Sequence, residues 1–184
     1  MKMLMVDSRE KPKAIKTILT QIESAGVPYM VSKLPIGDYM DFNRPGLIID
    51  RKQNIAELAK NCTSDHVRFR AELDRAKSVG ARLVILVEQD RYKDRDKWIH
   101  VEEISDLMLW SDKYTTIRGE KVFRVLSSWC SKYDIEVRFC DKRVTGKRIL
   151  EIIYPEILSM QAVSMKGESD GRHDKEIRCD KGGK

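Results

Sequence analysis

Long hydrophobic runs are absent from this 184-residue sequence. None approaches the ~20 apolar residues that a membrane-spanning helix needs. The apolar part of the opening MKMLMVDSRE is also too short for a secretory signal peptide. We therefore expect no membrane partner, and a protein that works in the cytoplasm, at the nucleoid or, in a eukaryote, in the nucleus.

Cysteine and histidine are scarce, with four and three residues. The cysteines form no C-x-x-C pair, and the histidines lie far from one another in the sequence. Structural zinc sites usually show such close spacings. The pattern therefore argues against a zinc site and favours reduced thiols.

Acidic residues are outnumbered: 29 Asp and Glu stand against 35 Lys and Arg, a net charge of +6. A basic protein attracts polyanions, so nucleic acid is a candidate partner. The length suits one domain with one core, which we place at residues 1–160. Residues 161–184 hold too few apolar side chains to offset the entropy of ordering, so we expect a disordered, charged tail.

Hydrophobic periodicity predicts an α/β fold in which strands alternate with helices. The expected strands cover residues 3–6, 29–34, 38–42, 47–50, 82–88 and 135–140. The expected helices begin at Pro12, Ile55, Asp65, Glu120 and Thr145, with a short one over 101–110. Proline and glycine between residues 35 and 46 predict antiparallel hairpins. The polar stretch 89–97 is interpreted as a solvated loop.

The segment GLIIDRK, residues 46–52, is an apolar strand that ends in three charges. Side chains alternate along a strand, so Asp50 and Lys52 share one face while Arg51 points to the other. A carboxylate beside an amine suits phosphodiester hydrolysis: the acid holds Mg²⁺ against a phosphate, and the amine orients water or stabilises charge. The alternative is a surface ion pair that merely ends the strand.

A second acid is needed, because Mg²⁺ is usually shared between one or two carboxylates and the substrate's phosphates. Asp38 opens the preceding strand, and a hairpin from it to Asp50 would bring the two acids together. Asp7, at the end of the first strand, could join them. The sequence alone leaves open whether these acids converge.

The segments VDSREK, GDYM, IIDRK, VRFRAELDRAK and RLVILVE follow one another in the chain. In this order they resemble the nuclease domain of the XPF-type structure-specific endonucleases, which carry V-D-x-R-E, G-D, E-R-K and a helix with G-R-F-x-x-Q. The resemblance implies a restriction-endonuclease-like, PD-(D/E)XK fold: a mixed central sheet flanked by helices. It also implies a Mg²⁺-dependent DNA endonuclease, with Mn²⁺ as a substitute, that cuts branched, flapped or nicked duplexes in repair, recombination or replication.

The matched positions carry implied roles. Asp38 and Asp50 correspond to the family's metal ligands and Lys52 to its catalytic lysine, while Arg51 supports the site or holds phosphate. Asp7 and Glu10 match the acids of the first motif, and Arg68 is expected near the scissile backbone.

The match has departures. Asp50 replaces the family's glutamate, which shortens the reach by one methylene, and Glu72 stands where glutamine is common. We interpret Glu72 and Arg75 as solvated helical pairs.

Further residues of the long helix and further binding partners can also be predicted. Arg118 and Lys121 open the long helix, whose N-terminus attracts anions, and they are expected to contact DNA phosphates. Trp129 and Tyr133 are interpreted as core or as a dimer interface. Relatives usually append a helix-hairpin-helix domain that residues 159–184 leave no room for, so DNA binding would need a homodimer, a protein partner or the tail. The alternative function is a catalytically silent DNA-binding or scaffolding subunit, which the presence of both acids and the lysine disfavours.

Overall fold

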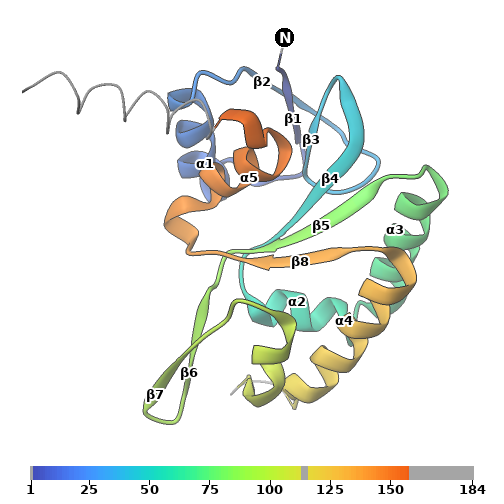
Figure 1. The fold of residues 1–184 in the computed structure, drawn as a ribbon, viewed down its shortest axis with the longest axis vertical. Helices are drawn as coiled ribbons and strands as arrows, with labels where there is room; N and C mark the ends of the chain where they lie inside the picture. The colour runs from blue at the N-terminus through green and yellow to red at the C-terminus, as the bar shows by residue number, and fades with distance from the viewer. Residues whose placement is uncertain (1, 113–115, 158–184) are drawn as a thin grey trace, which may run out of the picture.

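The computed structural model describes residues 2–112 and 116–157. Its centre is a six-stranded mixed sheet with helices on both faces, in the strand order β2-β1-β3-β4-β5-β8 (Figure 1). The strands are β1 (Leu4–Asp7), β2 (Tyr29–Ser32), β3 (Tyr39–Asp41), β4 (Arg44–Lys52), β5 (Arg82–Val87) and β8 (Glu136–Phe139). This architecture confirms the predicted mixed sheet flanked by helices. The expected tail, residues 161–184, lies outside the described residues.

Helices cover the sheet in two layers. They are α1 (Pro12–Ser24), α2 (Ile55–Asn61), α3 (His66–Ser78), α4 (Gly119–Tyr133) and α5 (Thr145–Ile153), with short 3-10 helices η1 (Ile104–Leu109) and η2 (Lys142–Val144). The segment predicted as a short helix over 101–110 is thus η1, which a capping box between Glu103 and Asp106 begins. No helix in the described ranges is long and apolar enough to cross a bilayer.

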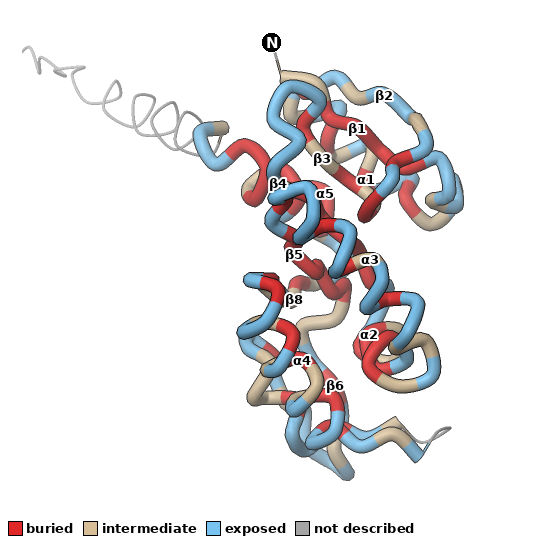
Figure 2. The backbone as a smooth tube through the Cα atoms, turned by 90° about the vertical axis from the view of Figure 1, so that its right-hand side faces the viewer, coloured by how far each residue is buried: buried red, intermediate tan, exposed pale blue. Residues whose placement is uncertain are grey.

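Two buried cores lie on opposite faces of the sheet, and β5 belongs to both. Leu83, Ile85 and Val87 pack with α2, α3 and α4. Val84 and Leu86 pack with α1 and α5 on the other side. Figure 2 shows the tube of β5 buried in the middle of the molecule. The continuous apolar run 82–88 is therefore the doubly covered central strand that its composition predicted.

The short strands before residue 50 do not form the expected series of hairpins. β2 pairs parallel with β1, with α1 as the crossover between them. Among these strands only β3 and β4 form a hairpin, and its turn, Phe42–Asn43, lies within the range 35–46 in which hairpin turns were expected. Arg44 pairs with Asp41 across this turn, and the exposed start of β4 tolerates Pro45.

Residues 91–100 form a second, two-stranded sheet, so the prediction of a solvated loop there is wrong. β6 (Arg91–Asp94) and β7 (Lys97–His100) are antiparallel. Tyr92 is the anchor: it is buried, and its hydroxyl donates to the Asp106 carbonyl at 2.9 Å. Only Tyr92, Trp98 and Ile99 are apolar in this stretch, so its composition favoured a loop.

The long helix α4 confirms the prediction from its periodicity. Val122, Leu126, Trp129 and Tyr133 are buried on one stripe. Trp129 lies against Phe69 of α3, with ring centroids 5.4 Å apart. Both aromatic residues of the stripe are therefore core residues, one of the two predicted alternatives.

Candidate active site

The carboxyl end of β4 separates its three charges between the faces of the sheet. Asp50 and Lys52 lie on the side of α2 and α3, and Lys52 Nζ is 2.6 Å from Asp50 Oδ2. Both side chains are more than nine-tenths buried. The Lys52 ammonium also lies 4.8 Å from the centre of the Phe69 ring. The predicted arrangement of these two side chains is therefore present.

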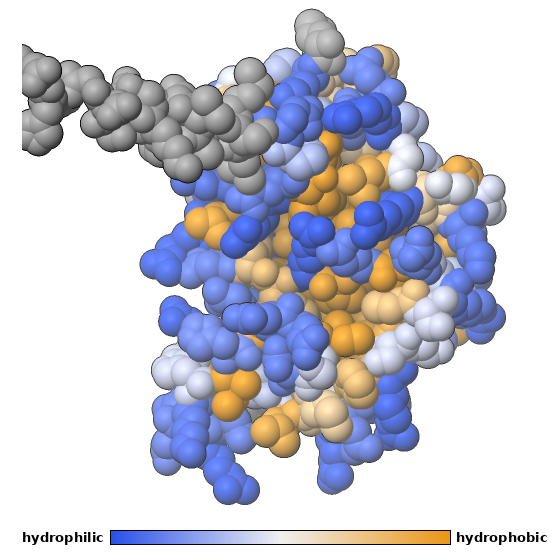
Figure 3. All heavy atoms as spheres, in the orientation of Figure 1, coloured by the Kyte–Doolittle hydropathy of each residue, from blue (hydrophilic) through white to orange (hydrophobic). Residues whose placement is uncertain are grey.

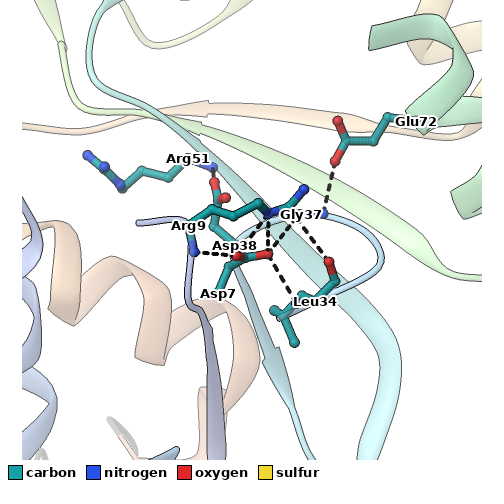
Figure 4. A network of polar contacts seen from close by, with 7 residues as sticks. All are labelled: Asp7, Arg9, Leu34, Gly37, Asp38, Arg51 and Glu72. Atoms are coloured by element: carbon teal, nitrogen blue, oxygen red, sulfur yellow. Dashed lines mark hydrogen bonds and ion pairs between the residues drawn. The ribbon is translucent and has the colours of Figure 1, made fainter. Parts of the chain in front are cut away.

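Asp38 is brought beside Asp50 by backbone contacts and not by its own strand. The Asp38 amide donates to the Ile49 carbonyl at 2.8 Å. Its Oδ2 accepts a hydrogen bond from the Arg51 amide at 2.7 Å (Figure 4). These two bonds fix Asp38 against the residues on either side of Asp50, so the two acids converge as the hairpin argument predicted.

Gly37 is the residue that lets this chain segment approach β4. Its φ is +62°, and a Cβ there would lie 2.4 Å from Ile48 Cγ2 and 2.9 Å from the Ile49 carbonyl oxygen. Side chains rarely adopt this backbone conformation, and the space for one is already filled. A glycine at position 37 is therefore required for Asp38 to reach the site.

Replacing Gly37 by alanine should lower the free energy of unfolding by about 2 kcal/mol, from backbone strain and overpacking. Urea unfolding measures the change. Gly46→Ala is the matched control, because Gly46 lies in β4 and a Cβ there meets nothing within 4 Å. We expect little change from it, and equal losses in the two variants would contradict the role assigned to Gly37.

The two acids share an unfavourable electrostatic environment. Burial, then the negative charges of Asp50 and Glu10, raise the pKa of Asp38 well above its usual value. Burial also raises the pKa of Asp50, even though the neighbouring Lys52 opposes this shift. Burial disfavours the charge on Lys52 as well, yet the carboxylate of Asp50 outweighs it and raises the pKa of Lys52. A bound cation would relieve this repulsion between carboxylates.

These residues line one cavity of about 310 Å³. Its lining holds five acids and four bases: Glu10, Asp38, Asp50, Glu57 and Glu72, with Arg9, Arg51, Lys52 and Arg68. Six of the nine were predicted as site residues from the sequence. The cavity is therefore polar and close to charge balance, unlike a pocket for an apolar ligand.

Arg51 stabilises the site from the opposite face of the sheet. Its guanidinium is 2.6 Å from Glu88 and 2.5 Å from Glu10, and its side chain is only 3% exposed. Charge-assisted bonds of this kind are stronger than neutral ones. Arg51 and Glu10 thus hold the end of β4 in place beneath the two acids.

Asp7 does not line the cavity. Its carboxylate accepts hydrogen bonds from the amide and the guanidinium of Arg9 and from the Leu34 amide (Figure 4). The pKa of Asp7 is lowered, because these bonds outweigh the effect of burial. The structure therefore gives Asp7 a positioning contact, and it turns Arg9 toward the cavity.

The three residues predicted to bind nucleic acid lie at different places in the structure. Arg68, at the first turn of α3, lines the cavity with a side chain that is 70% exposed. Lys121 lines a separate hollow of about 380 Å³ on α4, together with Arg124 and Trp129. Arg118 precedes α4 as its N-cap residue. Only Arg68 is thus brought to the candidate active site.

Glu72 is a site residue that the sequence analysis missed. Its carboxylate accepts a hydrogen bond from the Gly37 amide at 3.0 Å and faces the cavity, so the interpretation as a solvated pair is wrong (Figure 4). Glu57 also lines the cavity, and it accepts a hydrogen bond from the Gln53 amide at 2.7 Å. The available signal was spacing: Glu72 is one helical turn from Arg68 and shares its face.

The donor set fits a hard divalent cation bound partly through water and substrate. Asp38 and Asp50 supply two neighbouring carboxylates, and carboxylate oxygens are the ligands that Mg²⁺ prefers. Within residues 2–112 and 116–157, no three acidic, histidine or cysteine side chains group closely enough to form a metal site made of protein alone. Mg²⁺ rarely uses such a site, since it keeps several waters and shares phosphate oxygens.

Comparisons with known proteins find relatives in sequence and in fold. The sequence model of the ERCC4 domain matches residues 6–151. The structure of XPF from Aeropyrum pernix superposes with a TM-score of 0.57 at 19% identity, covering 91% of this chain and 69% of that one. A second structure of that XPF, in complex with DNA, gives 0.58 at 21% identity and covers 88% and 66% of the two chains. No curated protein matches the sequence. The fold is therefore restriction-endonuclease-like.

Proposed function

Because this chain belongs to the ERCC4 domain family of XPF-type nucleases, we propose that it is a metal-dependent DNA endonuclease. Its substrates would be branched, flapped or nicked duplexes. The observation that carries the proposal is the meeting of Asp38, Asp50 and Lys52 in one polar cavity. Carboxylates with a lysine in a restriction-endonuclease-like fold suit phosphodiester hydrolysis.

Asp38 and Asp50 would hold Mg²⁺, or Mn²⁺ as a substitute. When bound, the ion neutralises charge on a phosphate oxygen and makes a bound water a better nucleophile. After burial, the negative charge of Asp50 is the largest cause that raises the pKa of Asp38, and this closeness of the two acids supports the assignment. The shorter side chain of Asp50 is compatible with it, because Asp38 is bonded directly to the backbone of the next residue.

Lys52 has the geometry of a group that orients water or stabilises developing charge. Its Nζ lies between the Asp50 carboxylate and the Phe69 ring, so few of its rotamers remain open. The carboxylate keeps the ammonium protonated, which suits a donor to a phosphate oxygen and not a general base. Arg68, exposed at the mouth of the cavity, could contact the flanking backbone phosphate.

The charge distribution also supports a nucleic acid substrate. The whole chain carries a net charge of +6, which attracts DNA from a distance. The cavity itself holds five acids against four bases, so its side chains alone offer no net positive charge to a phosphate. A divalent cation that accompanies the scissile phosphate would supply that charge.

The decisive experiment compares forked, flapped and nicked DNA with Mg²⁺, with Mn²⁺ and with a chelator. We expect cleavage that requires metal and that falls below detection in both Asp50→Ala and Asp50→Asn. Asp74→Asn, an exposed acid on α3, is the control and should cut like the wild type. The asparagine variant matters because alanine would leave the buried Lys52 without its partner.

The other results would assign a different function. Tight DNA binding without cleavage by the wild type would indicate a catalytically silent subunit. If both Asp50 variants cut DNA as fast as the wild type, the assignment of Asp50 as a metal ligand would be wrong. If metal-dependent cleavage is found, DNA repair, recombination or replication are the processes that supply such substrates. A homodimer or a protein partner would then be sought by measuring the mass of the protein with and without DNA.

A further inference from the structure

The β6–β7 hairpin projects from one end of the molecule, away from the central sheet (Figure 1). Hydrophilic side chains cover its projecting end in the space-filling view (Figure 3). Nothing in the cavity chemistry described above uses this hairpin. It is nevertheless an ordered element, because the buried side chain of Tyr92 anchors one strand to the core.

The two faces of the hairpin differ in character. Strand pairing sets Arg91 opposite His100 and Lys93 opposite Trp98, and these four side chains are all exposed on the outer face. The inner face carries the buried Tyr92 and its partner Ile99. The outer face therefore presents two permanent cations, an indole and an imidazole, and no carboxylate.

Trp98 is much more exposed to solvent than the other two tryptophans. It is 62% exposed, whereas the other two tryptophans, Trp110 and Trp129, are 6% and 4% exposed. The Arg91 guanidinium lies 5.4 Å from the centre of the Trp98 ring. Neither Arg91 nor Lys93 has a carboxylate oxygen within 4 Å in the part of the chain that the structure describes, although the charge of Arg91 contributes to lowering the pKa of Asp141, whose main partner is Arg143. Two cations beside an exposed ring suit a ligand that combines negative charge with flat aromatic groups.

Single-stranded nucleic acid is the ligand with that combination. Its bases can stack on an aromatic side chain, and its phosphates can contact neighbouring cations. Duplex DNA offers the phosphates but keeps its base faces stacked inside the helix. A protein partner fits less well, because docking surfaces usually centre on several apolar side chains and Trp98 is the only one on this face.

The root of the hairpin is tied to the candidate active site. The Gln89 side chain accepts from the Ile55 amide at 3.0 Å and donates to the Arg91 carbonyl at 2.9 Å. Ile55 begins α2, three residues after Lys52, and the Glu88 amide donates directly to the Lys52 carbonyl. These bonds hold the hairpin at a set position relative to the cavity. Its four-residue strands extend about 13 Å from that point.

We propose that the outer face of the β6–β7 hairpin binds the single-stranded branch of the DNA substrate. Trp98 stacks on an unpaired base, while Arg91 and Lys93 contact the adjacent phosphates. This inference rests on the proposed function for the identity of the nucleic acid as DNA, and it adds a contact outside the cavity. It also explains how one domain can favour a branched duplex over a continuous one.

The test uses the full chain and a 12-nucleotide oligothymidylate, with a duplex of the same length for comparison. Because Trp98 is the exposed tryptophan, stacking should quench its fluorescence with the single strand and not with the duplex. Anisotropy of a labelled oligonucleotide should show binding weakened about 5- to 100-fold in Trp98→Ala, the usual contribution of one stacked base. Trp98→Phe should lose the quenching but keep most of the affinity.

Two further variants sharpen the result. Lys93→Ala should lower the salt dependence of single-strand binding by about 0.7 in slope, the contribution of one phosphate contact. Phe42→Ala removes an exposed aromatic residue from the β3–β4 turn and should leave the affinity unchanged. Thermal unfolding followed by circular dichroism should be the same in Trp98→Ala and the wild type, since the indole is outside the core.

Equal single-strand affinity in the wild type and Trp98→Ala would overturn the proposal, as would equal weakening for single strand and duplex. A nicked duplex without a branch has no single strand for the hairpin to bind. Its cleavage by the wild type therefore tests the nuclease assignment independently of the hairpin proposal. Cleavage without Trp98-dependent binding overturns the hairpin proposal alone. Trp98-dependent binding without any cleavage supports the hairpin and overturns the proposed function alone.

Discussion

Asp38→Asn should slow DNA cleavage at least about 100-fold and at the same time make the protein more stable. The asparagine side-chain oxygen can still accept the hydrogen bond from the Arg51 amide, so the geometry at this point is kept. What is lost is a negative charge that a metal ion needs. What is gained is relief from the cost of burying a charge and from repulsion by Asp50 and Glu10, together worth about 1 kcal/mol in the free energy of unfolding. Single-turnover cleavage rates and urea unfolding measure the two effects.

Asp41→Asn is the matched control, because Asp41 lies three residues further along the same hairpin. Its carboxylate is buried but paired with Arg44 at 2.9 Å. Burial alone would raise the pKa of Asp41, yet Arg44 and the Asn43 amide outweigh it and lower the pKa. We expect this variant to lose about 1–3 kcal/mol of stability and to keep its cleavage rate per folded molecule. If Asp38→Asn behaved in the same way, its assignment as a metal ligand would be wrong.

Arg51→Met should lower the free energy of unfolding by about 3–5 kcal/mol, the usual effect of removing one partner from a buried ion network. The substitution leaves the carboxylates of Glu88 and Glu10, which are 1% and 12% exposed, facing each other without a cation. Cleavage should fall as well, since Arg51 holds the end of β4 that carries Asp50 and Lys52. Urea unfolding gives the stability, and activity is compared at equal concentrations of folded protein.

Arg82→Met provides the contrast, because Arg82 pairs with Glu136 at 2.7 Å but is 56% exposed. Exposed pairs contribute less than about 1 kcal/mol, so this change should be small. The double variant Arg51→Met with Glu88→Leu should regain part of the loss, since it removes one of the two stranded charges. If Arg51→Met cost no more than Arg82→Met, the network around Arg51 would not support the site.

Much of the fold followed from patterns within short stretches of sequence. The stripe on α4 and the apolar run of β5 are local signals, and both elements formed as predicted. The pairing of the short strands was not predictable in the same way, because β1 and β2 are joined through α1 and not by a turn. The β6–β7 hairpin was missed because its charged residues suggested a loop, and its anchor Tyr92 bonds to Asp106, a partner outside the stretch.

The candidate site also has a part that the local sequence predicts and a part that it does not. That Asp50 and Lys52 share a face, with Arg51 opposite, was determined by the sequence alone, since alternation along a strand needs no other element. Three other placements were decided only by the tertiary structure: Asp38 against the Arg51 amide, Glu72 on the Gly37 amide, and Asp7 on the Leu34 amide. All three contacts join residues that are distant in the chain. The chemical groups that a sequence supplies are known residue by residue. Which side chains and backbone amides contact each other across different elements depends on strand register and packing, which local composition does not encode.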